Sequence, residues 1–161
     1  MDLIKILRNA FLVVLTCLLL SACATKKVSA PAGQMQGDVY TGTDTVEYLA
    51  DGVPDRVFFA TNESILTTRS RDTLRKQAGW LRENSDVTVV LEGHADERGT
   101  REYNLALGER RANAAKDYLM TYGVSSNRIS VISYGKERPV DSGSNPLALS
   151  KNRRSVTVKA N

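Results

Sequence analysis

The stretch that decides the fold is Val87-Thr88-Val89-Val90-Leu91-Glu92-Gly93-His94-Ala95-Asp96. Four of its first five residues are aliphatic, so the pattern predicts a buried strand that is covered on both faces. Side chains alternate between the two faces of a strand, and we therefore expect Glu92, His94 and Asp96 to share one side. Asp96 is placed where the chain leaves the sheet.

A helix is expected to return beside this strand, from Asn104 to Tyr122. Arg111 lies four residues from both Leu107 and Ala115, so at about 100° per residue it falls about 40° from each, within the apolar stripe. Burying an unpaired guanidinium is costly, so Arg111 needs an acceptor. Asp96 is the carboxylate that the strand, the turn and the returning helix would bring near it.

This predicted pair of opposite charges has two interpretations. An acid and a guanidinium that flank a groove could bind an ammonium and a carboxylate on one ligand. Alternatively, Asp96 and Arg111 form a structural salt bridge. Spacing alone does not separate the two.

The N-terminus has the pattern of a bacterial export signal. A positively charged start precedes an apolar run over residues 10–20, which is too short to span a bilayer comfortably. Leu20-Ser21-Ala22-Cys23 resembles a lipoprotein box, in which the cysteine is acylated and becomes the mature N-terminus. We therefore expect a signal peptide at residues 1–22 and a lipid on Cys23. The alternatives are an uncleaved anchor helix and an ordinary signal peptide with an incidental cysteine.

Cleavage before Cys23 would also decide the cysteine chemistry. Cys17 would leave with the signal, so the mature domain would have no thiol for a disulfide, a metal site or a nucleophile. The formal charge would fall from +4 to +3, because the signal contains Asp2, Lys5 and Arg8. This mild, interspersed charge gives no reason to propose nucleic acid as a partner.

The remaining chain divides into a tether and a domain. Residues 23–52 are rich in Lys, Ser, Pro, Gly, Gln and Thr, which predicts a flexible tether, with a short strand possible at residues 45–49. Residues 53–161 contain strand and helix patterns in alternation. Further strands are expected at residues 55–60, 129–134 and 155–159, and further helices from Thr67 or Thr68 to about Asn84 and over residues 147–152. Gly123 is expected to stop the second helix.

This order of elements predicts an α+β fold. We expect a two-layer sandwich in which a mixed four-stranded sheet, βαβαββ-like, carries its helices on one face. The spacing of the strands allows right-handed crossovers.

Several linked motifs together resemble those of the peptidoglycan-associated lipoproteins, which carry a domain like that of outer membrane protein A. The motifs are Glu92 to Thr100, Tyr103-Asn104, Leu107 to Ala114, Ser133 to Glu137 and Ser150 to Arg154. The resemblance covers about residue 53 to the C-terminus, plus the lipoprotein box. Ala24 after the cysteine, as in sorted bacterial lipoproteins, points to the outer membrane, with the domain in the periplasm.

The resemblance implies a tether rather than an enzyme. Such proteins bind peptidoglycan non-covalently through the meso-diaminopimelate of its stem peptide, and work with the Tol proteins during envelope constriction at division. The implied partners are peptidoglycan, the outer membrane and a TolB-type periplasmic propeller protein, and no cofactor is implied. A general wall-binding lipoprotein outside the Tol-Pal system is an alternative.

By motif, Asp96 matches the acid that takes the ligand's ammonium, and Arg111 the arginine that takes its carboxylate. Asn104 and Asn62 match polar residues of the same pocket. Asn104 is alternatively a helix N-cap, and Asn62 a loop residue that hydrogen-bonds its own backbone. Many relatives have an aspartate where this chain has Ala60, so any contact from that side chain is absent here.

Other polar residues near these motifs have less specific interpretations. His94 is the only histidine, and no second histidine or cysteine completes a metal ligand set, so we expect it to form structural hydrogen bonds. Arg153 and Arg154 are expected to pair with surface acids, with a role beside the ligand groove as the alternative. A periplasmic hydrolase that uses Glu92 and Asp96 is the enzyme alternative. Two carboxylates on one face of one strand are a poor match to a catalytic pair across a cleft.

Overall fold

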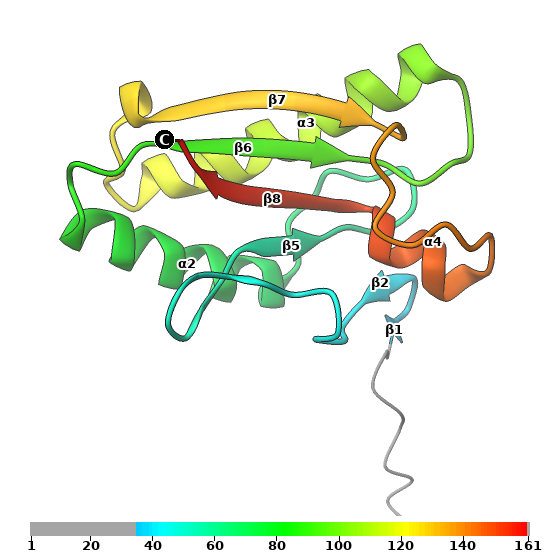
Figure 1. The fold of residues 1–161 in the computed structure, drawn as a ribbon, viewed down its shortest axis with the longest axis horizontal. Coiled ribbons are helices and arrows are strands. Elements are labelled where there is room, and N and C mark those ends of the chain that lie inside the picture. Colours follow the sequence, from blue (N-terminus) through cyan, green and yellow to red (C-terminus); the bar gives the residue numbers. More distant parts are fainter. Residues whose placement is uncertain (1–34, 161) are drawn as a thin grey trace, which may run out of the picture. The chain divides into compact units, whose positions relative to one another are not determined.

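A mixed four-stranded sheet is the centre of the computed structural model, which describes residues 35–160 (Figure 1). The strand order is β5-β8-β6-β7, in which β6 and β7 are parallel and β8 is antiparallel to both of its neighbours. The strands are β5 (Arg56–Phe58), β6 (Val89–His94), β7 (Ile129–Gly135) and β8 (Arg154–Lys159). The predicted α+β class and mixed sheet are confirmed.

Two long helices pack on one face of this sheet, as predicted (Figure 1). They are α2 (Thr68–Glu83) and α3 (Arg101–Thr121), and shorter helical segments follow at η1 (Ser126–Arg128) and α4 (Pro146–Asn152). Thr67 is the N-cap of α2, because its side chain accepts a hydrogen bond from the backbone N–H of Ser70. Gly123 ends α3 in a left-handed conformation at φ +87°. No helix within residues 35–160 is long and apolar enough to cross a membrane.

The hydrophobic core lies between the sheet and the two long helices. On β6, Val89 and Leu91 are buried toward the helices, whereas Val90 and Glu92 are only partly buried on the other face. The prediction that this strand is covered on both faces is therefore wrong, because both long helices lie on the same side. The core residues are Val57, Phe59, Leu74, Ala78, Leu81, Val89, Leu91, Ala112, Ala115, Leu119, Val124 and Ile129.

A close approach of α3 to β6 positions the functional site. A Cβ atom on Gly93 would lie 1.9 Å from the carbonyl oxygen of Gly108, so only glycine fits this contact. The strand's register with β7 shifts between Gly93 and His94. The chain therefore leaves the sheet beside the N-terminal half of α3.

The N-terminal part of the described chain folds onto the domain. Two hairpins form from β1 (Met35–Gln36) with β2 (Val39–Tyr40) and from β3 (Tyr48–Ala50) with β4 (Val53–Pro54). Tyr40 and Leu49 are buried, and the Tyr40 ring packs edge-on against Phe58. The tether predicted to run to residue 52 is therefore wrong over residues 35–52, because buried apolar side chains hold this segment. The predicted signal, Cys23 and the rest of the tether lie outside the described residues.

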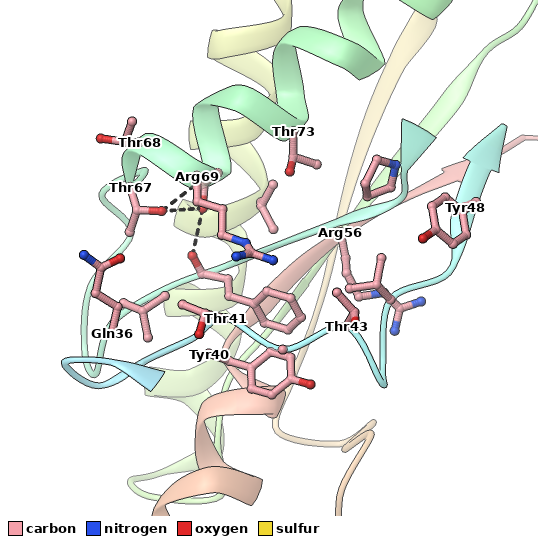
Figure 2. Close-up of a pocket in the computed structure, with 17 residues that line it drawn as sticks. Gln36, Tyr40, Thr41, Thr43, Tyr48, Arg56, Thr67, Thr68, Arg69 and Thr73 are labelled. Carbon is pink, nitrogen blue, oxygen red and sulfur yellow. Dashed lines mark hydrogen bonds between the residues drawn. The ribbon is translucent and has the colours of Figure 1, made fainter. Parts of the chain in front are cut away.

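Together with β5 and α2, this N-terminal segment lines a pocket of about 420 Å³ (Figure 2). Tyr40, Thr41 and Thr43 border it on one side, and Thr67 and Arg69 of the α2 start on another (Figure 2). None of the four predicted ligand-binding residues lines this pocket.

Candidate functional site

The four predicted ligand-binding residues line one cavity of about 540 Å³. The cavity lies between the loop after β5, the loop after β6 and the N-terminal half of α3. Its lining residues are Thr61, Asn62, Asp96, Arg98, Gly99, Tyr103, Asn104, Leu107 and Arg111. The turn after β6 supplies Asp96, and α3 supplies Asn104 and Arg111, while Asn62 comes from the loop after β5. The fold therefore brings all four predicted residues to one cavity.

Asp96 is buried and its carboxylate binds two arginines. Arg98 donates from Nη2 to Oδ2 at 2.6 Å and from Nε to Oδ1 at 3.2 Å, and its backbone N–H also reaches Oδ1. Arg153 donates from Nη1 to Oδ2 at 3.2 Å. Burial by itself would raise the pKa of Asp96, but the contacts with these arginines outweigh it and hold the pKa below its usual value. Asp96 is therefore a carboxylate at neutral pH.

Arg111 is completely buried and is held by backbone carbonyls rather than by Asp96. Its guanidinium donates to the carbonyl oxygens of Glu63 at 2.8 Å, His94 at 2.8 Å and Ala60 at 3.0 Å. It also lies 5.4 Å from the centre of the Phe59 ring. The predicted pairing of Arg111 with Asp96 is wrong, because no ion pair joins them among the described residues and loop carbonyls take the donors instead.

The charges around the cavity favour an anionic group. Burial, with nearby Arg153 adding to it, lowers the pKa of Arg111 to about 10, so the side chain stays charged at neutral pH. Asp96 is the only acid that lines the cavity, and its charge is already paired with Arg98 and Arg153. No carboxylate of the residues that the structure describes contacts Arg111, so a ligand carboxylate is a complementary group for its positive charge.

Asn104 and Asn62 form hydrogen bonds between the segments that line the cavity. Asn104 is buried and donates from Nδ2 to the carbonyl oxygen of Arg98 at 2.8 Å, which fixes the turn after β6. The alternative of an N-cap at Asn104 is wrong, because α3 begins earlier and Thr100 caps it. Asn62 has a left-handed backbone at φ +59°, and its Oδ1 accepts a hydrogen bond from the Tyr103 hydroxyl. This contact joins the loop after β5 to α3.

Sequence reasoning missed Arg98 and Tyr103, and it misplaced Arg153. Arg98 follows Asp96 by two residues in the same turn, a spacing that could have pointed to it. Arg153 is buried rather than on the surface, and it also donates to the carbonyl oxygens of Phe59 and Asp38. Its partner Asp96 lies 57 residues earlier in the chain, so no local pattern reveals the contact.

His94 lies apart from this cavity. It is buried, its Nε2 lies 3.6 Å from a carboxylate oxygen of Glu92, and neither ring nitrogen has a hydrogen-bond partner among the described residues. The prediction of structural hydrogen bonding is therefore wrong. Burial, together with the charges of Arg154 and Arg138, lowers the pKa of His94 to about 3, so the ring is neutral at physiological pH.

Glu92 and Asp96 do not share one side. Glu92 lines a groove with Arg154 and Val158 on the helix-free face of the sheet, whereas Asp96 lines the cavity beside α3. The register shift after Gly93 interrupts the alternation on which the prediction rested. The two carboxylates of the hydrolase alternative therefore do not face one cleft. Within residues 35–160, no three His, Cys, Asp or Glu side chains are grouped to hold a metal ion.

Comparisons with known proteins agree with these motifs. The sequence model of the OmpA family matches residues 58–153. A peptidoglycan-associated lipoprotein of Mesorhizobium japonicum is 43% identical over 154 residues, which cover 94% of this chain and 92% of the relative. One from Pasteurella multocida is 38% identical over 152 residues, with 94% and 97% covered.

Solved structures show the same domain. The crystal structure of the peptidoglycan-associated lipoprotein from Burkholderia pseudomallei is 33% identical and superimposes with a TM-score of 0.64, covering 66% of this chain and 90% of that chain. The C-terminal domain of Helicobacter pylori MotB superimposes with a TM-score of 0.62 over 66% of this chain and 84% of that chain. It is only 20% identical, so it supports the fold alone.

Proposed function

Because this chain belongs to the OmpA family and to the peptidoglycan-associated lipoproteins, we propose that its domain binds peptidoglycan non-covalently while a lipid on Cys23 anchors it in the outer membrane. The relatives' name, peptidoglycan-associated lipoprotein, gives an association with peptidoglycan and a lipid. The lipoprotein box at residues 20–23 and the cavity after β6 are the features of this chain that support the two halves of the proposal.

The proposed ligand is meso-diaminopimelate of the peptidoglycan stem peptide, which carries an ammonium and a carboxylate. The ammonium is assigned to Asp96 and the carboxylate to Arg111, with Asn104 and Asn62 as wall residues. A cavity of about 540 Å³ is of the size that small-molecule sites have. The observation that carries this assignment is that Asp96 and Arg111 line one cavity without forming an ion pair with each other.

Access to Arg111 requires a local opening. Its side chain has no exposed surface, and the exposed side chains of Tyr103 and Asn62 are hydrogen-bonded to each other at the same cavity. We propose that a ligand carboxylate reaches the guanidinium when these two side chains separate. The three carbonyl contacts of Arg111 leave part of its donor capacity free for such a group.

Cosedimentation with purified peptidoglycan tests this function. Asp96→Ala is expected to weaken binding about 30- to 4000-fold, because loss of one partner of a charge-assisted contact costs about 2 to 5 kcal/mol. Free diaminopimelate should compete with the wall for the wild type. Asp72→Asn, which removes an exposed carboxylate on α2, is the matched control and should bind like the wild type. Undiminished binding by Asp96→Ala would reject the assignment.

A place in the Tol-Pal system is the finer part of the proposal. In that role the protein links the outer membrane to the wall and supports invagination during division, with a TolB-type periplasmic propeller protein as its partner. A pull-down with that propeller protein tests this role. Absence of capture would favour a general wall-binding lipoprotein outside the system.

The non-enzymatic role has its own test. A hydrolase would release soluble fragments from purified peptidoglycan, whereas a binding protein only sediments with it. The positions of Glu92 and Asp96 in separate hollows favour binding. Substitution Cys23→Ser tests the anchor, because the protein should then move from the membrane fraction to the soluble periplasmic fraction.

A further inference from the structure

Donors from two arginines fill the acceptor positions of the Asp96 carboxylate. Oδ1 accepts hydrogen bonds from the backbone N–H and the Nε of Arg98, and Oδ2 accepts from Nη2 of Arg98 and Nη1 of Arg153. A carboxylate has about four acceptor sites, so these four bonds occupy it fully. An ammonium group can therefore bind Asp96 only if one of the two arginines withdraws.

The surroundings of the two arginines decide which one withdraws. The side chain of Arg153 is 3% exposed and is also held by the carbonyl oxygens of Phe59 and Asp38. The side chain of Arg98 is 52% exposed, and its one other contact given by the structure is with the Thr61 hydroxyl at 3.2 Å. Moving Arg98 into solvent costs little free energy, because its side chain is already half exposed. Moving Arg153 would leave buried groups unpaired and cost more, so Arg98 is the arginine that withdraws.

We propose that Arg98 determines the specificity of the cavity by occupying the position of the ligand's ammonium, so that binding is an exchange of one cation for another. This inference rests on the proposed function. Only a ligand with its own positive charge can replace Arg98 and keep the buried carboxylate paired. A ligand that ends in an uncharged group leaves Arg98 in place and gains nothing from Asp96.

The test compares two ligands by calorimetry with the mature protein. One is meso-diaminopimelate, and the other is pimelate, which has the same carbon chain and both carboxylates but no ammonium. In Arg98→Gln the competing cation is absent, so affinity for diaminopimelate should rise about fivefold, the worth of an ion pair of about 1 kcal/mol. Affinity for pimelate should change less than about twofold, because a ligand without an ammonium does not displace Arg98.

A matched control separates exchange from a general change in charge. Arg101→Gln also removes an exposed arginine with a carboxylate partner, Glu137, but it lies outside the cavity lining. It should leave both affinities unchanged. A loss of diaminopimelate affinity in Arg98→Gln, or an equal gain for both ligands, would overturn the inference.

The design also distinguishes failure of this inference from failure of the proposed function. If Asp96→Asn binds diaminopimelate like the wild type, or if the wild type does not bind it, the proposed function fails and the exchange fails with it. If the wild type binds, Asp96→Asn does not, and Arg98→Gln shows no gain, then only the exchange is rejected.

Discussion

Two neighbouring arginines, Arg153 and Arg154, are buried members of two polar clusters that differ in how well their buried polar atoms are hydrogen-bonded. The cavity cluster consists of Asp96, Arg98, Arg111 and Arg153. The open-face cluster, on the helix-free side of the sheet, consists of Glu92, His94, Arg138 and Arg154. Arg153 binds a carboxylate and two carbonyl oxygens. Arg154 reaches carbonyl oxygens at 3.2 and 3.4 Å, and within residues 35–160 its Nε has no hydrogen-bond partner.

The two clusters differ in how completely their buried polar atoms are hydrogen-bonded. The better-bonded cluster is the one at the proposed ligand site. In the cavity cluster each guanidinium nitrogen of Arg111 and of Arg153 donates to an acceptor, so the side chains are held in defined positions. In the open-face cluster both ring nitrogens of His94 and Nε of Arg154 have no hydrogen-bond partner in the described part of the chain. Unpartnered buried polar atoms cost free energy, so the first cluster should stabilise the domain and the second should not.

The largest effect is expected from Arg111→Ala in the cavity cluster. It leaves three carbonyl oxygens without their donor and opens a hole in the core, so the free energy of unfolding should fall by about 3 to 5 kcal/mol. Urea unfolding followed by circular dichroism measures it. Lys116→Ala, on the same helix, should stay within about 0.5 kcal/mol of the wild type. A loss below about 1 kcal/mol for Arg111→Ala would mean that the carbonyl contacts do not hold the loops.

An intermediate effect is expected from His94 in acid. The folded state lowers its pKa from 6.5 to about 3, so the unfolded chain binds a proton first as the pH falls, and stability is lost between these values. Between pH 6 and pH 4 the wild type should lose on the order of 2 kcal/mol more than His94→Gln. Urea unfolding at both pH values measures the difference. Parallel losses in the two proteins would show that His94 is accessible to protons in the fold.

The smallest effect is expected from Arg154→Met in the open-face cluster. An apolar side chain of similar length removes a poorly compensated charge, so stability at pH 7 should stay within about 1 kcal/mol of the wild type. Thermal or urea unfolding provides the measurement. A loss comparable to that of Arg111→Ala would erase the distinction between the clusters.

Most of the fold could be predicted because its signals are local. Thr67 and Gly123 mark a helix start and a helix end by their own backbone preferences, and the apolar spacing of α2 and α3 identifies their buried sides. The packing of residues 35–52 on the domain could not be predicted in this way. Tyr40 and Leu49 are isolated apolar residues in a polar segment, and only their contacts with the domain bury them.

The candidate site could be predicted in its position but not in its contacts. Asp96 and Arg111 meet at one cavity because a strand, a turn and a helix bring them there. The acceptors of Arg111 are backbone carbonyls, and two of them lie about fifty residues away in the loop after β5. Every residue has a carbonyl group, so side-chain identity gives no signal for such a contact.

Asp38 connects the N-terminal segment of the described chain to the candidate site. Its carboxylate accepts from the backbone N–H of Thr61, and its carbonyl oxygen accepts from Arg153, which in turn holds Asp96. Under the proposed function, these bonds would join the N-terminal segment directly to the carboxylate assigned to the ligand's ammonium.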